Sequence, residues 1–247
     1  MSHPSTDCTL LLLGHGSHFN ADSSRPVFEH ADRLIASGQW GEVRVGFWKE
    51  EPSLARCLDS CAMGMVVVVP IFMSMGYFTE EIIPRELRLH GQACEVDGRH
   101  IRYAPPLGTH PRLAEVMRQR ALEAGATSDS AVVVLGHGTQ RNQNSQMTIY
   151  QQAEWLKEES DFVEIETVFL DQAPGLDEVW DRVRAHHIVV VPLFVADGWH
   201  VGSTIPEDLG LRKGGVNRDG RRLDFAAAVG THPQLAEVIH RLGLSVC

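Results

Sequence analysis

An internal repeat constrains this chain more than any other feature: residues recur along it at a constant offset of 122. The motif Gly14-His15-Gly16 returns as Gly136-His137-Gly138, and segment 108–116, GTHPRLAEV, returns at 230–238 as GTHPQLAEV. The same offset relates Phe47 to Phe169, Pro52 to Pro174, Pro70 to Pro192, Gly76 to Gly198 and Ile83-Pro84 to Ile205-Pro206. A single register without gaps indicates tandem duplication. We therefore predict two repeats, residues 1–126 and 127–247.

Each repeat alternates extended and helical patterns. Four extended segments are expected per repeat: 10–13, 43–48, 66–69 and 99–104, then 131–135, 164–170, 188–191 and 221–228. Helices are expected between them at 26–37, 53–62, 150–158 and 175–185, and after each GTHP motif. Strands that are apolar throughout and alternate with helices favour a parallel sheet covered on both faces. The predicted fold class is α/β: two tandem, doubly wound parallel-sheet domains related by a pseudo-two-fold axis, with an interdomain cleft.

Composition excludes several classes of protein. The formal net charge of -10 includes no basic stripe, which argues against a nucleic-acid binder. The longest apolar runs, such as 65–72, are too short for a membrane span, and residues 1–9 do not resemble a signal peptide. Five cysteines at 8, 57, 61, 94 and 247 form no CxxC pair, so reduced thiols and a cytoplasmic location are expected.

The two repeats differ at the places where a ligand is expected. In open parallel sheets, ligands bind beyond the carboxyl ends of the strands, which selects the loops after the first three strands of each repeat. The first of these loops carries a histidine in both repeats, His15 and His137, whereas the second carries Lys49 or Asp171 and the third carries Phe78 or His200. The shared residues define the fold, so these differences are expected to carry function.

The second repeat alone offers a complete metal-ligand set. Two imidazoles and a carboxylate, here His137, His200 and Asp171, can bind Zn, Fe, Co or Ni, whereas lysine and phenylalanine cannot. Each residue alone has an ordinary structural explanation: a turn histidine, a helix-capping carboxylate and a loop histidine. Their convergence on one sheet edge in one repeat favours a metal site.

Four motifs carry a resemblance to a known family. They are LLLGHGS at 11–17, VVVVP at 66–70, FxxxGxxxxxxIP at 72–84 and the GTHPxL helix start. The whole chain resembles the class II chelatases of the cobalamin and sirohaem pathways, the CbiX/SirB family of sirohydrochlorin chelatases, in its long two-repeat form. The resemblance implies a lyase-type enzyme that inserts Co2+ or Fe2+ into sirohydrochlorin, a step of porphyrin-type biosynthesis.

The resemblance also implies roles for particular residues. The family holds its metal with the histidines of the GHG and GxH motifs and a nearby carboxylate, which fall on His137, His200 and Asp171. Because Phe78 stands at the GxH position of the first repeat, that repeat is expected to lack a full metal site. Some two-repeat members use the first half, so the choice of the second half rests on these residues.

Metal insertion requires removal of two pyrrole protons and delivery of the ion to the ring. Neutral histidines can act as metal ligands and as proton acceptors near neutral pH. The site should stay open, so that the ion can be passed on. We therefore expect no permanent cofactor, only a divalent metal substrate (Co2+, Fe2+ or Ni2+), and the sequence does not choose between these ions.

The expected organic partner is sirohydrochlorin or a related anionic tetrapyrrole. Cationic side chains are expected to bind the carboxylates of this ligand, and Arg141 is the first candidate, with Thr139 near it in the sequence. Trp199 and Phe78 could contact the ring. No nucleic-acid or membrane partner is expected. Two repeats in one chain could form the cleft that a single-repeat relative builds as a dimer, so a monomer would suffice.

Two other functions fit the same residues. A metal-dependent hydrolase could use His137, Asp171 and His200 to activate water, and would retain its metal. A carrier with the chelatase fold would bind metal or tetrapyrrole without turnover. A histidine phosphatase is disfavoured, because its nucleophilic histidine follows an arginine and here the histidines follow Gly14 and Gly136.

Overall fold

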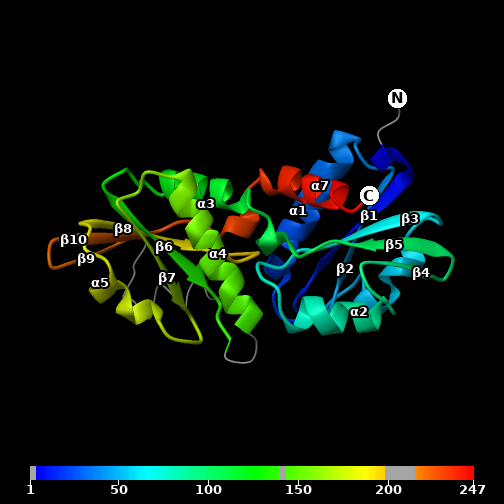
Figure 1. Cartoon of the computed structure of the whole chain (residues 1–247), viewed down its shortest axis with the longest axis horizontal. Coiled ribbons are helices and arrows are strands. Elements are labelled where there is room, and N and C mark those ends of the chain that lie inside the picture. Colours follow the sequence, from blue (N-terminus) through cyan, green and yellow to red (C-terminus); the bar gives the residue numbers. More distant parts are fainter. Residues whose placement is uncertain (1–3, 140–142, 198–214) are drawn as a thin grey trace. The chain divides into compact units, whose positions relative to one another are not determined.

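The computed structural model describes residues 4–139, 143–197 and 215–247 and contains two five-stranded sheets (Figure 1). The first sheet has the order β2-β1-β3-β5-β4 and the second the order β7-β6-β8-β10-β9. The strands of the first are β1 Cys8–Gly14, β2 Glu42–Phe47, β3 Met65–Pro70, β4 Ala93–Val96 and β5 Arg99–Tyr103. Those of the second are β6 Ser130–Gly136, β7 Glu164–Phe169, β8 His187–Pro192, β9 Val216–Arg218 and β10 Arg221–Phe225. The corresponding strands therefore keep the sequence offset.

Helices cover both faces of each sheet, as the α/β prediction required. The α-helices are α1 Arg25–Ser37, α2 Ile83–Glu86, α3 Leu113–Glu123, α4 Gln143–Glu159, α5 Val179–Arg182 and α7 Leu235–Leu244. The predicted helix 53–62 is a 3-10 helix, Leu54–Ser60, and 175–185 contains the 3-10 turn Leu176–Glu178 and α5. The central strands are fully buried from Leu10 to Leu13 and from Val66 to Val69. Burial on both faces explains why these strands are apolar at every position.

The edge strands β4 and β9 pair antiparallel with β5 and β10, so each sheet is mixed rather than wholly parallel. The prediction of four strands per repeat omitted both. Each hairpin turns at an Asp-Gly pair, Asp97-Gly98 and Asp219-Gly220, whose φ angles of 49° and 74°, and 53° and 76°, are all positive. Asp-Gly is a strong signal for such a turn, so the hairpins were readable from the sequence.

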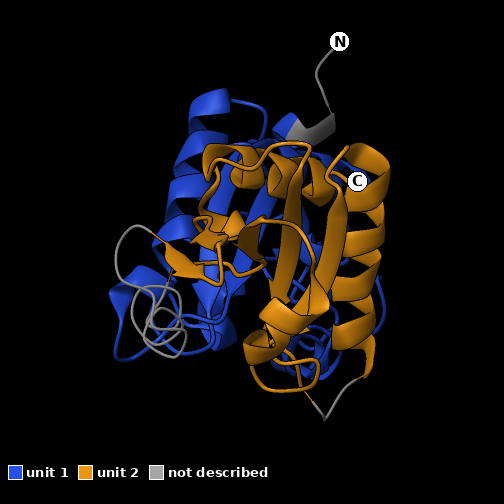
Figure 2. Cartoon of the chain, turned by 90° about the vertical axis from the view of Figure 1, so that its left-hand side faces the viewer, with its two compact units in different colours: residues 1–110, 233–247 blue, residues 111–232 orange. Residues whose placement is uncertain are grey.

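The two compact units do not coincide with the two sequence repeats (Figure 2). Unit 1 comprises residues 1–110 and 233–247, and unit 2 comprises residues 111–232. The difference arises because the last helix of each repeat packs on the sheet of the other: α3 contacts α4 and β8, and α7 contacts α1 and β3. Each unit therefore contains the last helix of the other repeat, and the repeat pattern does not show this exchange.

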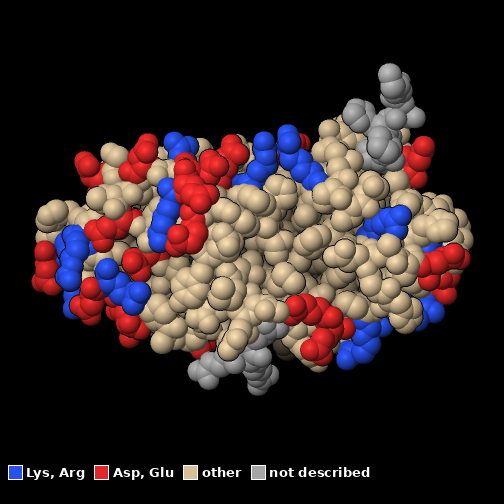
Figure 3. Space-filling view, in the orientation of Figure 1, with Lys and Arg blue, Asp and Glu red and all other residues tan. Residues whose placement is uncertain are grey.

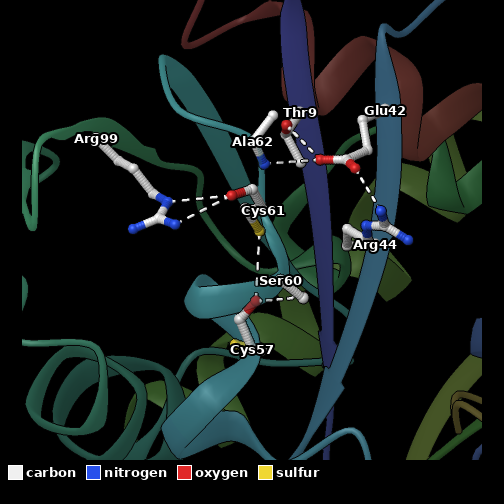
Figure 4. Close-up of polar contacts among 8 residues, drawn as sticks. All are labelled: Thr9, Glu42, Arg44, Cys57, Ser60, Cys61, Ala62 and Arg99. Carbon is white, nitrogen blue, oxygen red and sulfur yellow. Dashed lines mark hydrogen bonds and ion pairs between the residues drawn. The ribbon is translucent and has the colours of Figure 1, made fainter.

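A polar clamp supports the amino edge of each sheet. In unit 1 the Glu42 carboxylate accepts hydrogen bonds from Thr9 Oγ1 at 2.9 Å and from the backbone N–H of Ala62 at 3.0 Å (Figure 4). Arg99 donates to the Cys61 carbonyl at 3.1 Å. In unit 2, Glu164 likewise accepts from the backbone N–H groups of Arg184 and Ala185, and Arg221 donates to three carbonyls. The clamp recurs in both repeats, which indicates a structural role.

His232 makes the stability of unit 2 sensitive to acid. Burial and the nearby Arg120 lower the pKa of His232, although Glu123 accepts from its ring at 3.3 Å. In the unfolded chain the histidine pKa is ordinary, ~6.5. Below that pH the unfolded chain therefore binds a proton at this histidine more readily than the folded chain does. The free energy of unfolding should therefore fall as the pH drops below about 6.5, by at most ~1.4 kcal/mol per pH unit for this group. Urea unfolding of the wild type and His232→Gln between pH 7 and 5 measures it; parallel slopes would contradict this account.

In the described part of the chain, no helix is both long enough and apolar enough to cross a membrane.

Candidate metal and substrate site

The carboxyl edge of the unit 2 sheet brings His137 and Asp171 together. His137 directly follows β6, and Asp171 lies two residues beyond β7, the neighbouring parallel strand. The backbone extends this pairing past the strand ends, because the Asp171 N–H donates to the His137 carbonyl at 3.0 Å. The sheet itself thus holds the two residues side by side.

Their side chains also meet. Nδ1 of His137 lies 3.0 Å from Oδ2 of Asp171, and both side chains are 61% exposed. An ion pair or hydrogen bond this exposed stabilises a fold by only ~0–1 kcal/mol, so stability does not explain its presence. A carboxylate on one ring nitrogen is the usual support for a histidine whose other nitrogen binds a metal. The geometry supports this use of the pair and leaves it accessible to ligands.

Phe194, which the sequence analysis did not single out, contacts the same histidine. Its ring centre lies 6.2 Å from that of His137, in an edge-to-face arrangement. The loop that carries Phe194 after β8 is held by Gly230, whose N–H donates to the Phe194 carbonyl at 2.8 Å. A Cβ on Gly230 would lie 2.1 Å from the carbonyl oxygen of Val195, so only glycine permits this approach. The glycine of the repeated GTHP motif therefore positions the loop beside the site.

Replacing Gly230 with alanine should displace this loop. We expect about 1–3 kcal/mol of lost stability from overpacking, together with weaker cobalt binding. Gly108→Ala is the matched control, because a Cβ there would lie 2.0 Å from the Met73 carbonyl in unit 1. Urea unfolding and calorimetric titration with Co2+ measure the two effects. Equal cobalt affinities in the two variants would show that the Gly230 contact does not position the site.

The remaining predicted residues of the second repeat are only partly described. The N–H of Thr139 donates to Oε1 of Gln172 at 2.7 Å, which ties the loop after β6 to that after β7. Gln172 was not among the predicted residues, and no sequence pattern marked it. Arg141, Trp199 and His200 lie outside the described residues. Among the described residues, no group of three metal-ligating side chains occurs, so the full predicted set is untested.

Unit 1 places the corresponding residues at the same edge, with different chemistry. The Lys49 N–H donates to the His15 carbonyl at 2.9 Å, as Asp171 does to His137. Nδ1 of His15, however, lies 2.9 Å from the Gly16 carbonyl instead of a carboxylate. Phe78 packs edge-to-face on His15, with ring centres 4.8 Å apart. This edge therefore offers one imidazole, one cation and an aromatic ring.

Other potential ligands and nucleophiles serve packing. Burial raises the pKa of Cys57 to about 12 and that of Cys61 to about 11, so neither supplies a thiolate at neutral pH. Ser130, His187 and Asp224 form a hydrogen-bonded series with two distances of 3.0 Å. Ser130 is fully buried and its Oγ also accepts from the Thr127 N–H, so the series cannot present a nucleophile.

Comparisons with known proteins show which proteins the chain is similar to. The family model CbiX matches residues 9–124 and again residues 131–242. A Halobacterium salinarum protein named probable sirohydrochlorin cobaltochelatase is 42% identical over 258 residues, covering 93% of this chain and 88% of that protein.

Solved structures agree on the fold. A multi-domain Deinococcus radiodurans protein, described as similar to chelatases and as having two additional novel domains, matches 96% of this chain at 31% identity with a TM-score of 0.84. The chain spans about half of that protein, 54%. The sirohydrochlorin chelatase SirB of Bacillus subtilis subspecies spizizenii, solved with cobalt, has a TM-score of 0.76 at 17% identity and covers 97% and 95% of the two chains. At that identity, the likeness shows the fold alone.

Proposed function

This chain belongs to the CbiX family, and from that premise we propose that it is a sirohydrochlorin chelatase, which inserts a divalent metal, Co2+ or Fe2+, into the tetrapyrrole. The observation that carries the proposal is the exposed contact between His137 and Asp171 at the carboxyl edge of unit 2. The name of the Halobacterium relative supports the reaction and favours cobalt. The metal is a substrate here rather than a resident cofactor.

The contact between His137 and Asp171 suggests how the ion is held. Asp171 would accept from Nδ1 of His137, which fixes the ring orientation and leaves Nε2 free to bind the metal. His200 is proposed as the second ligand. The ion would then be transferred to the ring as the pyrrole N–H protons leave, with the histidines as acceptors. An open, incompletely coordinated ion can be released in this way.

The other residues of the proposed site would hold the organic substrate. Arg141 would pair with a carboxylate of the tetrapyrrole, next to Thr139, while Trp199 and Phe78 would contact the ring. In unit 1 the ring of Phe78 is half-buried and lies against His15. In this proposal the repeat 127–247 carries the metal ligands, and the repeat 1–126 has no complete metal site.

The surface charge fits a small anionic substrate better than a nucleic acid. On the face shown in Figure 3, the described Lys and Arg side chains are interspersed with Asp and Glu, and they form no continuous basic stripe there. Nucleic-acid binding relies on such a stripe to neutralise successive phosphates.

Asp171→Asn tests the proposed role of the carboxylate. The amide can still accept from Nδ1 but loses the negative charge, so we expect kcat/KM for cobalt insertion to fall by ~10–100-fold. Asp171→Ala, which also removes the acceptor, should lose more. Glu178→Gln, at a partly exposed carboxylate on the 3-10 turn of unit 2, is the control, because the amide can still accept from the Gly175 N–H. Steady-state absorbance assays measure the effect, and unchanged kinetics in both Asp171 variants would exclude Asp171 from the site.

The reaction itself is tested by mixing purified protein with sirohydrochlorin and Co2+, Fe2+ or Ni2+ and following the tetrapyrrole spectrum. The proposal predicts many insertions per chain, at a rate above that of the uncatalysed reaction. Tight binding without turnover would indicate a carrier. Stoichiometric metal that stays bound through purification, together with no insertion, would favour a hydrolase.

A further inference from the structure

Unit 1 carries a positive charge at the position where unit 2 carries the proposed metal-supporting carboxylate. The two positions are equivalent in the backbone, since the N–H of Lys49 and that of Asp171 donate to the carbonyls of His15 and His137 at 2.9 and 3.0 Å. At this position on the carboxyl edge of the sheet, the side chain is therefore positively charged in unit 1 and negatively charged in unit 2. A lysine there would repel a metal ion instead of helping to bind it.

The ammonium group of Lys49 lies against an aromatic ring and has no carboxylate partner among the residues that the structure describes. Its Nζ is 5.6 Å from the centre of the Trp48 ring. Lys49 forms no ion pair with any residue in the described part of the chain, and Glu51, two positions further along, pairs with Arg56 at 2.8 Å instead. A half-buried ammonium with three donors, which pairs with no anion in the described ranges, is suited to binding an external anion.

Two further aromatic rings, those of Phe78 and Phe72, continue from the Trp48 ring that this cation contacts. The ring centre of Phe78 lies 5.8 Å from that of Phe72, in a stacked arrangement, and 6.2 Å from that of Trp48. All three rings are partly buried and pack on the unit 1 core, which fixes their positions. An aromatic surface beside a lone cation matches a ligand with an apolar, planar body and an anionic substituent.

We propose that Lys49 binds a carboxylate side chain of the tetrapyrrole, and that Trp48 and Phe78 contact the adjoining apolar part of that substrate. The inference rests on the proposed chelatase function. It makes Lys49 a specificity-determining residue, which sets the affinity for carboxylate-bearing tetrapyrroles.

The test measures the affinity for metal-free sirohydrochlorin by quenching of tryptophan fluorescence. Lys49→Met should bind about tenfold more weakly, as expected for loss of a charge-assisted contact, and Lys49→Arg should retain most of the affinity. Lys157→Met is the control, because Lys157 pairs with Glu154 on α4 at 2.8 Å. In turnover assays, Lys49→Met should raise the KM for the tetrapyrrole by the same factor, with kcat and Co2+ affinity unchanged.

Esterified substrate separates a direct contact from a general loss of structure. The methyl ester of sirohydrochlorin should bind the wild type weakly, and Lys49→Met should cause little further loss. Equal affinity of Lys49→Met and wild type for sirohydrochlorin, or equal loss on both ligands, would overturn the proposal. If the wild type binds sirohydrochlorin without inserting metal, the chelatase function fails, while the affinity comparison still decides the role of Lys49. If the wild type binds no tetrapyrrole, both proposals fail.

Discussion

His137→Ala is expected to abolish cobalt insertion into sirohydrochlorin while the protein stays folded. The side chain is 61% exposed, so its removal leaves no cavity in the core. Loss of a group that orients a metal ligand typically lowers metal affinity or activity by ~10–100-fold. Loss of the ligand itself should lower activity further, so we expect at least a ~100-fold fall in kcat/KM. Insertion is followed by absorbance, folding by circular dichroism, and Co2+ affinity by calorimetry.

His15→Ala is the matched control, because the same GHG turn places His15 at the same edge of unit 1. Its ring meets the Gly16 carbonyl and Phe78 rather than a carboxylate. We therefore expect a much smaller loss of activity and unchanged cobalt affinity. An equal loss in the two variants would show that unit 1 takes part in metal binding.

His200→Ala is expected to have an effect as large as that of His137→Ala, since the proposed site relies on two imidazoles. His186→Ala is a suitable control: His186 is exposed at the amino end of β8, at the opposite edge of the sheet. Cobalt affinity should fall in the first variant and stay unchanged in the second. Full insertion activity in His200→Ala would remove this histidine from the site.

The repeat register predicted most of the fold. Continuous apolar runs such as 10–13 and 66–69 became the buried central strands, because a parallel sheet covered on both faces needs apolar residues at every position. The exchange of α3 and α7 between the units was not predictable in this way. A repeat pattern gives the order of elements, and an amphipathic helix can pack on any sheet within reach of its linker.

The site was predictable from one histidine that both repeats share and from the neighbouring positions at which they differ. Comparison at a fixed offset singled out His137 and Asp171, and the structure places their side chains in contact. It did not single out Phe194 or Gln172, whose roles depend on the conformations of loops. The repeated GTHP glycine was interpreted as part of a helix start, although close approach of two backbone segments explains Gly230.

The proposal that the second repeat binds the metal and the first does not is tested most directly by crystals of the protein soaked in Co2+. Anomalous scattering at the cobalt absorption edge locates the ion without reference to activity. The account predicts one peak per chain, within coordination distance of Nε2 of His137 and of His200, with Asp171 on Nδ1 of His137. A cobalt peak on His15, or no peak beside His137, would contradict it.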